Sequence, residues 1–392
     1  MIGKAGNSGK RSDCEVVASV HPLPGNEIII RSKVMSLYGA SIRQLLEDKL
    51  SFYGLRGVRL EIEDQGALEW VMAARVEAAL RQLFELPETL FVPGRRELPG
   101  SSAKDRDRVS RLYLPGNSPS MMLNAGIHQP DAIILDLEDS VAPAKKAEAR
   151  LLVRNALLAT DFMGAERMVR INQLPLGLTD LDLVVPALPQ LILVPKCESA
   201  AQVTTVAEHI RGIKAAHAIS QEIWLMPIIE SALGIEHAFE IACASQTVVA
   251  MAIGLEDYTA DLGIQRTLHG TESLYACSAL VNACKAAGIQ ANDSVFADVM
   301  DMEGLKATIQ RSKMLGFDGM GCIHPRQIAT IHAGYAPDAS ETEKASLIVA
   351  AYEDALAKGL GVVALGSKMI DLPVVKRAQK VLARAKARGM IK

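Results

Sequence analysis

Aromatic residues, paired cysteine motifs and long apolar runs are all scarce in this 392-residue chain. Only 4% of the residues are aromatic whereas 49% are hydrophobic, which indicates an aliphatic core of the kind found in α/β proteins. No apolar run reaches the roughly 18 residues of a membrane-spanning helix, and the first residues lack the apolar core of a signal peptide. A net charge of −3 gives no general attraction to nucleic acid or to an anionic membrane. We therefore expect neither nucleic acid nor membrane as a partner.

The spacing of the six cysteines and eight histidines excludes the common zinc motifs. No Cys-x-x-Cys, His-x-His or His-Glu-x-x-His pattern is present. Scattered single cysteines favour reduced thiols, and hence a cytoplasmic protein, over a disulfide framework. We expect Cys197 and Cys322 to be small core residues and not nucleophiles.

The composition divides the chain into four segments. Gly, Pro, Ser and charged residues cluster at 93–107, which predicts a linker. Residues 1–92 before it are predicted to form a small α+β domain. Residues 108–338 form the main domain and 339–392 a C-terminal helical segment.

Within the small domain, period-two alternation predicts strands at 27–32 and 58–62. Helical spacing predicts helices at 41–53 and 68–86. In the C-terminal segment, Ser340 is expected to cap a helix, with Glu343 completing a capping box.

Beyond the linker, short apolar segments alternate with helical ones. This rhythm, with near-continuous apolar strands, favours a (β/α)₈ TIM barrel. No Gly-x-Gly-x-x-Gly follows the first strand, so a dinucleotide-binding open sheet is less favoured. The eight predicted strands lie at 112–114, 132–135, 168–171, 191–194, 223–226, 248–253, 288–290 and 319–323.

Two carboxylates directly follow successive predicted strands. Glu230 follows the fifth strand and Asp257 the sixth. The C-terminal ends of barrel strands form the mouth where catalytic residues gather, so these carboxylates are expected to converge. Oxygen ligands suit Mg²⁺, which takes one or two carboxylates plus waters and substrate oxygens. The alternative is that both belong to ordinary surface loops.

Other polar residues are expected at the same mouth, and a guanidinium among them suits a carboxylate ligand. Arg170 could hold the carboxylate of a small oxyacid through its fork of donors. The acidic residues after the second strand could instead form rim ion pairs with Lys145, Lys146 and Arg150. Lys196 is expected to be structural and His324 a packed rim residue. The predicted mouth residues are Asp136, Glu138, Asp139, Arg170, Asn172, Lys196, Glu256 and His324.

An ordered set of motifs makes residues 106–392 resemble the HpcH/HpaI aldolase family of citrate lyase β subunits and malyl-CoA or citramalyl-CoA lyases. The resemblance implies a TIM barrel that assembles as a homotrimer or hexamer. It also implies that Glu230 and Asp257 bind Mg²⁺, that Arg170 and the backbone of Gly254 contact the oxyacid, and that Glu256 lies at the substrate site. The motifs lie at 112–117, 136–141, 169–172, 194–199, 228–234, 254–258, 323–325 and 366–371.

The same resemblance gives Asp371 a catalytic role from a C-terminal lid of a neighbouring subunit. We expect it to act as the general acid or base at the thioester α-carbon. The alternative is a helix cap, because Pro373 could open the last helix just after it.

The small domain resembles the citrate lyase γ subunit, an acyl carrier protein, at 56–69 and 74–79. That family attaches its prosthetic group to a serine, and the corresponding stretch here, 5–13, offers only Ser8 or Ser12 in a broken register. The domain is therefore expected to be a retained scaffold or oligomerisation module.

These features predict a Mg²⁺-dependent carbon–carbon lyase. Its substrate would be a 3-hydroxyacyl thioester such as citramalyl-CoA, malyl-CoA or a citryl thioester, which it would cleave into an acetyl thioester and a 2-oxo acid. Three alternatives stay open: a lyase acting on a group borne by its own or a partner's carrier domain, a malyl-thioester hydrolase, and a non-catalytic scaffold. The sequence does not distinguish free coenzyme A from a carrier-bound substrate, nor one 2-oxo acid from another.

Overall fold

The computed structural model describes residues 2–359, 363–365, 368–387 and 390–391. The chain divides into two compact units, residues 1–328 and 329–392. The first unit contains the small domain and the barrel, and the division falls within helix α12 (Arg326–Tyr335). Among the described helices, none combines the length and hydropathy needed to cross a bilayer.

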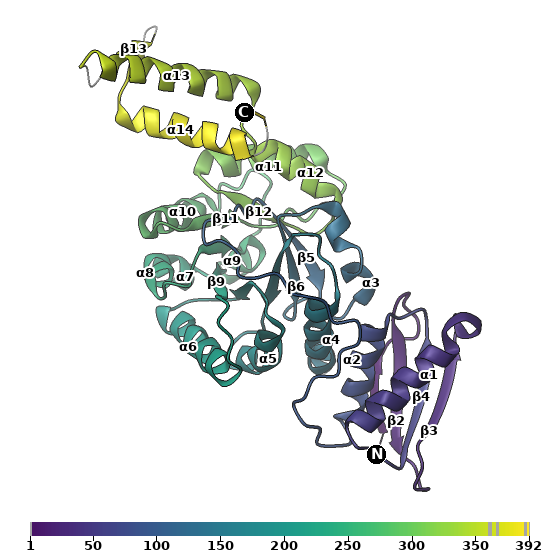
Figure 1. The fold of residues 1–392 in the computed structure, drawn as a ribbon. Helices are drawn as coiled ribbons and strands as arrows, with labels where there is room; N and C mark the ends of the chain where they lie inside the picture. Colours follow the sequence, from purple (N-terminus) through teal and green to yellow (C-terminus); the bar gives the residue numbers. More distant parts are fainter. Residues whose placement is uncertain (1, 360–362, 366–367, 388–389, 392) are drawn as a thin grey trace. The chain divides into compact units, whose positions relative to one another are not determined.

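Eight parallel strands close into a barrel, which confirms the predicted TIM-type fold (Figure 1). The strand order β5-β6-β7-β8-β9-β10-β11-β12 follows the sequence, and β12 pairs with β5 to close the ring. All eight predicted strands are present within a few residues of their expected bounds. The barrel strands are β5 (Ser110–Pro115), β6 (Ala132–Asp136), β7 (Glu166–Arg170), β8 (Leu191–Val194), β9 (Trp224–Ile229), β10 (Ala250–Ile253), β11 (Gln290–Asp293) and β12 (Gly319–Cys322).

Helices surround this ring and cover its outer face, as parallel strands require. They include α3 (Pro119–Met122), η1 (Ala125–His128), η2 (Pro143–Lys145), α4 (Lys146–Ala159), α5 (Leu176–Val184), η3 (Val185–Ala187), α6 (Ala200–Ala216), α7 (Ala232–Glu236), α8 (Ala238–Cys243), α9 (Leu255–Asp261), α10 (Leu274–Ala287) and α11 (Met302–Leu315).

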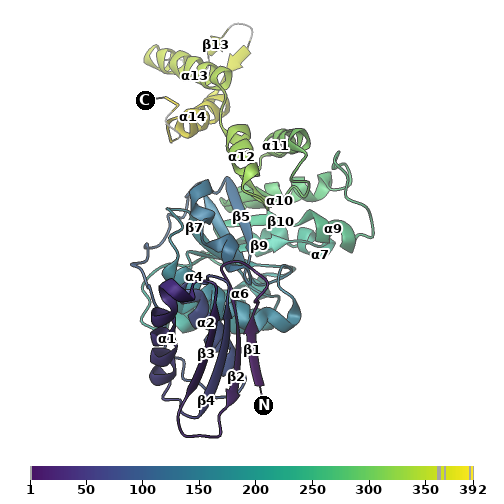
Figure 2. The same ribbon diagram turned by 90° about the vertical axis from the view of Figure 1, so that its right-hand side faces the viewer.

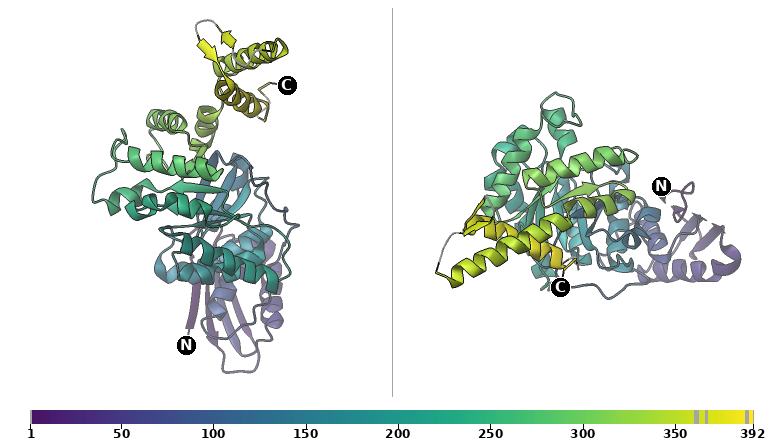
Figure 3. Two further views of the ribbon diagram at one scale, coloured as in Figure 1. Left: turned by 90° about the vertical axis from the view of Figure 1, so that its left-hand side faces the viewer. Right: turned by 90° about the horizontal axis from the view of Figure 1, so that it is seen from above.

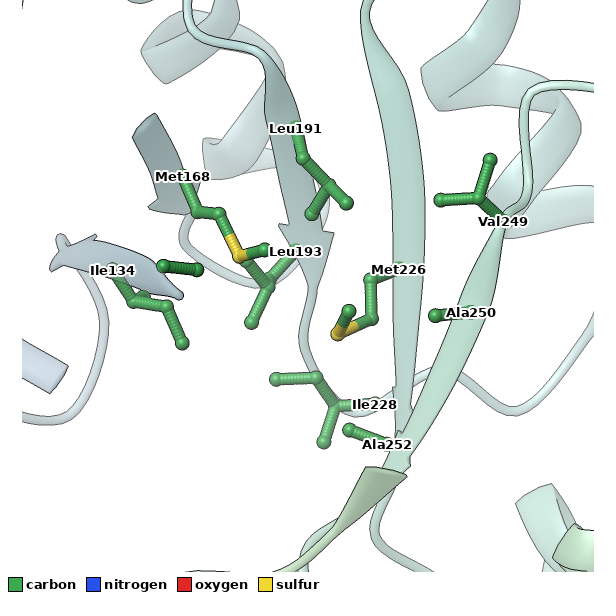
Figure 4. Packing of buried hydrophobic residues seen from close by; sticks show 10 residues of the cluster. Ile134, Met168, Leu191, Leu193, Met226, Ile228, Val249, Ala250 and Ala252 are labelled. Atoms are coloured by element: carbon green, nitrogen blue, oxygen red, sulfur yellow. The ribbon is translucent and has the colours of Figure 1, made fainter. Parts of the chain in front are cut away.

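Aliphatic side chains of moderate size fill the barrel interior. Met168, Leu193 and Met226 point toward one another between neighbouring strands (Figure 4). Every second residue of each strand faces inward, as period-two alternation requires, and Ala250 and Ala252 leave room for the larger side chains. Cys197 and Cys322 are fully buried, and burial raises the pKa of both thiols to about 12, which agrees with their expected role as core residues.

The small domain is a four-stranded sheet with two helices on one face. Its strand order is β1-β2-β4-β3, with β3 parallel to β4 and the other pairs antiparallel (Figure 2). The first two strands were not predicted, α1 begins six residues earlier than expected, and α2 ends at Leu80 instead of residue 86. The elements are β1 (Ile2–Gly6), β2 (Cys14–Val20), β3 (Glu27–Ser32), α1 (Met35–Phe52), β4 (Val58–Asp64) and α2 (Glu69–Leu80).

Helix α2 joins the small domain to the barrel through a buried ionic network. Its Glu77 accepts hydrogen bonds from both terminal nitrogens of Arg154 on α4, at 3.0 and 2.8 Å. Lys49 of α1 lies 3.2 Å from the same carboxylate. The side chains of Glu77 and Lys49 are fully buried and that of Arg154 is 1% exposed, so one carboxylate balances two buried cations.

The second unit contains α13 (Ala339–Ala357), a short hairpin of β13 (Val363–Leu365) and β14 (Lys368–Ile370), and α14 (Leu372–Ala387). Helices α13 and α14 pack against each other (Figure 3). The prediction that Ser340 caps α13 was wrong. Asp338 is the cap, and its carboxylate accepts the Glu341 N–H at 2.6 Å while Glu341 completes the capping box. A charged Asp also interacts favourably with the helix dipole, which Ser does not.

We expect Glu77→Gln to lower the free energy of unfolding by about 3–5 kcal/mol, because it leaves Arg154 and Lys49 buried without a counter-charge. Denaturant unfolding measures this loss. Glu303→Gln is the control, since it removes a carboxylate that is 84% exposed and that pairs, among the residues described, only with Lys306. It should cost less than about 1 kcal/mol. Equal losses in the two variants would contradict a role for the buried network.

Candidate functional site

The C-terminal ends of the barrel strands surround a cavity of about 750 Å³. Its walls come from the ends of β5, β6, β7 and β9 to β12 and from the loops that follow them. Predicted site residues that line it are Asp136, Asp139, Arg170, Glu230, Gly254, Glu256, Asp257 and His324. The sequence therefore located this mouth correctly.

Glu230 is one of the buried carboxylates of the site, with only 4% of the residue exposed. The pKa of Glu230 is raised to about 8, first by burial and then by the charge of Glu138. The charge of Asp257 and a hydrogen bond with this residue raise it further. One stabilising contact is the backbone N–H of Lys196, which donates to Oε1 at 3.3 Å. Carboxylates held this close repel each other, so the site favours binding of a cation.

Gly254 allows the loop after β10 to approach Glu230. A Cβ at this position would lie 2.7 Å from Cγ and 3.1 Å from Oε2 of Glu230. Any larger residue would displace the carboxylate. The structure thus gives Gly254 a packing role beside Glu230, in addition to the predicted contact of its backbone with an oxyacid.

Arg170 ends β7 and is held by the acidic loop after β6. Its Nε and Nη2 donate to the two carboxylate oxygens of Asp136 at 2.7 and 2.8 Å. Nη1 lies 2.7 Å from Glu138 and 3.4 Å from Asp139. All three nitrogens of the guanidinium therefore face protein carboxylates, and a substrate carboxylate would have to displace Glu138 and Asp139 from Nη1.

The expected alternative partners of these acidic residues proved wrong. Lys146 Nζ donates to the backbone carbonyls of Leu137 and Glu138, Lys145 pairs with Glu148, and Arg150 pairs with Asp180. Arg170 is the partner of Asp136 instead, because it lies on the neighbouring strand in register with Asp136.

Lys196 has a more central position than the sequence indicated. Its Nζ lies 3.1 Å from Asp257, 3.5 Å from Glu138 and 3.6 Å from Asp139. Burial alone would lower the pKa of Lys196, but these carboxylates and a hydrogen bond to Asp257 raise it above its usual range. The residue adopts a left-handed backbone conformation, with φ of 47°, where the chain turns after β8. Its ammonium group therefore contacts Asp257, one of the two predicted metal ligands.

Glu256 points toward the rim, where Arg266 donates to it at 2.7 Å. Asp257, on the next residue of α9, faces Lys196 instead. His324 lines the cavity, and its Nδ1 accepts the backbone N–H of Arg326 at 3.1 Å. Asn172 turns away from the mouth, because its side chain and backbone N–H both donate to buried Asp180.

The remaining predicted residues lie outside the barrel mouth or in the other unit. Asp371 directly precedes α14, and its Oδ1 accepts the Val374 N–H at 3.3 Å. It therefore caps this helix, which was the alternative to a catalytic role. Gly366 and Ser367 of its motif lie outside the described residues. Ser8 and Ser12 are half-buried in the loop between β1 and β2.

Sequence reasoning missed two cavity residues on the first barrel strand. Arg111 is 1% exposed, and its Nη2 donates to the carbonyl of Asp293 at 3.0 Å. The ring of Tyr113 lies 5.4 Å from the guanidinium of Arg170, and burial raises the pKa of its hydroxyl. The signal was present, because inward positions of β5 alternate and both residues share that face.

The donor set fits a magnesium ion. Glu230 and Asp257 supply carboxylate oxygens, which a hard cation prefers, and their mutual repulsion requires a positive partner. Among the described residues, no three His, Cys, Asp or Glu side chains are arranged to hold a metal by themselves. Two carboxylates agree with Mg²⁺, which keeps waters and takes substrate oxygens as further ligands.

Comparison with known proteins gives the family. Residues 109–325 match the family described as HpcH/HpaI aldolase/citrate lyase. The chain belongs to this family. Citrate lyase subunit β of Escherichia coli K12 is 40% identical over 290 residues, which cover 73% of this chain and 96% of that protein. The L-malyl-CoA/β-methylmalyl-CoA lyase of Cereibacter sphaeroides is 35% identical over 302 residues, covering 71% of this chain and 95% of that protein.

A solved structure supports the same relation. The protein CitE of Mycobacterium tuberculosis, in complex with magnesium, acetoacetate and coenzyme A, has a TM-score of 0.60 and 30% identity. The match covers 72% of this chain and all of that one. The small domain is matched separately, because residues 4–83 match the ACP family described as malonate decarboxylase delta subunit. A carrier-like domain is thus fused to a citrate lyase-type barrel.

We expect Asp257→Asn to weaken Mg²⁺ binding by at least ten-fold, because it removes one of two anionic oxygen donors. Calorimetry with Mg²⁺ or Mn²⁺ measures the affinity directly and does not depend on turnover. Glu256→Gln is a matched control on the adjacent residue, whose carboxylate pairs with Arg266, and it should retain metal affinity. Equal affinity in the two variants would show that Asp257 is not a ligand.

Proposed function

We propose that this protein is a Mg²⁺-dependent carbon–carbon lyase that cleaves a 3-hydroxyacyl thioester, such as a citramalyl, malyl or citryl thioester, into an acetyl thioester and a 2-oxo acid. The observation that carries the proposal is the pair Glu230 and Asp257 beside Arg170 in one cavity of a family member. A bound Mg²⁺ would supply Lewis-acid stabilisation for the oxygen that becomes the carbonyl of the 2-oxo acid.

Arg170 would orient the substrate through its carboxylate. Binding at Nη1, the nitrogen that Asp136 does not contact, would displace Glu138 and Asp139, which lie 2.7 and 3.4 Å from it. Asp136 and the ring of Tyr113 fix the plane of the guanidinium. The side chain of Arg170 therefore loses little conformational freedom when the substrate binds. This placement would put the oxyacid next to Glu230.

The reaction consumes no co-reactant. It does need a group that transfers a proton. The bond between the α and β carbons breaks, the hydroxyl loses its proton as the carbonyl forms, and the electron pair passes to the thioester α-carbon. That carbon then takes a proton. We propose Asp371 as the group that transfers it, entering the site from a neighbouring subunit of a homotrimer or hexamer.

One further function is favoured by a specific observation. Residues 4–83 match an acyl carrier family, so the barrel could act on an acyl group borne by its own or a partner's carrier domain. The intact mass of the purified protein separates the two, since a covalent prosthetic group adds mass to the chain.

Product analysis tests the lyase proposal. With (S)-citramalyl-CoA, malyl-CoA and citryl-CoA supplied in turn with Mg²⁺, we expect acetyl-CoA and a 2-oxo acid in equal amounts from at least one substrate, and no turnover in EDTA. Free coenzyme A with the intact hydroxy acid would instead show a hydrolase. Turnover of none of the three would contradict action on free coenzyme A thioesters.

We expect Asp371→Asn to lose most of kcat while Mg²⁺ and oxyacid binding remain, because the proton transfer contributes only in the transition state. Mixing Asp371→Asn with Arg170→Ala protein under conditions of subunit exchange should restore part of the activity. Exchange without any recovery would show that Asp371 acts within its own subunit or only caps α14.

A further inference from the structure

The loop that joins β1 to β2 carries two adjacent cations at its tip. The strands pair in antiparallel register up to Gly6 and Glu15, and the Asn7 N–H donates to the Cys14 carbonyl at 3.1 Å. Lys10 and Arg11 lie between them and are exposed. Neither forms an ion pair or a side-chain hydrogen bond with another described residue.

Buried ion pairs fix the base of this loop. Asp13 accepts two hydrogen bonds from Arg75 of α2, both at 3.0 Å, and each of these side chains is 1% exposed. Gly6, at the other side of the base, has a φ of +86°, and a Cβ there would lie 1.8 Å from the Cys14 carbonyl oxygen. Only glycine therefore fits, and the tip projects from a rigid support.

The same base is attached to the catalytic face of the barrel. Arg75 donates to the backbone carbonyl of Asn117 at 3.2 Å, and the Gly6 N–H donates to Glu148 at 2.9 Å. Asn117 lies two residues beyond the C-terminal end of β5, and Ser120, three residues later, lines the cavity. Glu148 lies in the first turn of α4, which follows the loop that carries Glu138. The base of the loop is thus attached to segments that follow the C-terminal ends of β5 and β6.

Charges around the anchor leave the tip positive. The carboxylates of Asp13 and Glu148 are balanced by Arg75 and by Lys145, whose Nζ lies 3.1 Å from Glu148. Asp64, opposite Cys14 in the sheet, adds one more buried carboxylate at the base. Lys10 and Arg11 at the tip form no ion pair with a described residue, so their charges are available to a ligand. An anion carrying several phosphates is the complementary ligand.

We propose that Lys10 and Arg11 bind the phosphate groups of a coenzyme A thioester whose acyl end enters the barrel cavity. This inference rests on the proposed function and names free coenzyme A thioesters as the substrate class. Coenzyme A carries phosphates at one end and the thioester at the other, joined by a flexible arm, which matches a cationic tip next to a cavity that contains the oxyacid site. Ionic binding at this loop takes the place of the covalent attachment that a carrier domain would use.

The double variant Lys10→Ala/Arg11→Ala tests this site by direct binding. Calorimetry with coenzyme A itself should show an affinity about ten-fold lower than that of the unaltered protein, and the difference should shrink as salt rises. Pantetheine, which has no phosphate, should bind equally to both proteins. The control is Arg56→Ala, which removes an exposed cation just before β4, where Val58 pairs with Val20 at the end of the sheet opposite Cys14.

Each outcome decides the matter. Unchanged coenzyme A affinity in the double variant, or an equal loss with Arg56→Ala, overturns the site. A covalent prosthetic group on Ser8 or Ser12, seen by intact mass and peptide mapping, also overturns it. If the unaltered protein turns over no acyl-CoA but the double variant still loses coenzyme A affinity selectively, the lyase proposal fails and the binding site stands.

Discussion

Repulsion between carboxylates at the barrel mouth is the constraint on which the site depends. Asp136, Glu138, Glu230 and Asp257 lie within one cluster, and burial makes the negative charges of Asp136, Glu138 and Glu230 costly. Arg170 and Lys196 reach into this cluster from β7 and from the turn after β8, and each contacts more than one carboxylate. Burial and the neighbouring carboxylates Glu138 and Asp257 raise the pKa of Glu230 despite these two cations. A bound cation would offset this concentration of negative charge.

The junction between the small domain and the barrel has the opposite charge balance. Positive charge is in excess around Glu77, since Arg154 and Lys49 share this one buried carboxylate. Around Arg75 the partners come from three segments: Asp13, Glu148 and the Asn117 carbonyl. Such contacts contribute little net stability compared with apolar packing, but they are directional, and breaking one partner is costly. They therefore fix where the loop between β1 and β2 lies against the barrel.

Barrel strands such as β6, β8, β9 and β10 could be predicted because each is a short apolar run buried on both faces, and the same pattern located Glu230 and Asp257 after β9 and β10. Strands β1 and β2 were missed because β1 (Ile2–Gly6) has few apolar residues and is defined by its pairing with β2, a contact that local sequence does not encode. The partners of Asp136 were wrong for a related reason. Lys145 and Lys146 are near in sequence, but register places Arg170 across the strands. The cap of α13 was predicted two residues too late, at Ser340. Asp338 and Ser340 are both suitable cap residues, and only the backbone conformation decides between them.

The fusion of a carrier-like domain to a lyase barrel can be explained by the need to bring the substrate to the cavity from a fixed point. A prosthetic arm needs an attachment point close to the cavity that it serves, and the loop between β1 and β2 is anchored at such a point through Gly6 and Asp13. If the proposed phosphate site exists, cations at the same tip would hold a diffusible thioester by its phosphates, and a covalent arm would not be required. Lys10 and Arg11 occupy the tip, while Ser12 lies next to buried Asp13 with its N–H donated to the Gln65 carbonyl. The buried contacts of Arg75 and Glu148 are common to both arrangements, so the same interface would support either way of presenting a substrate.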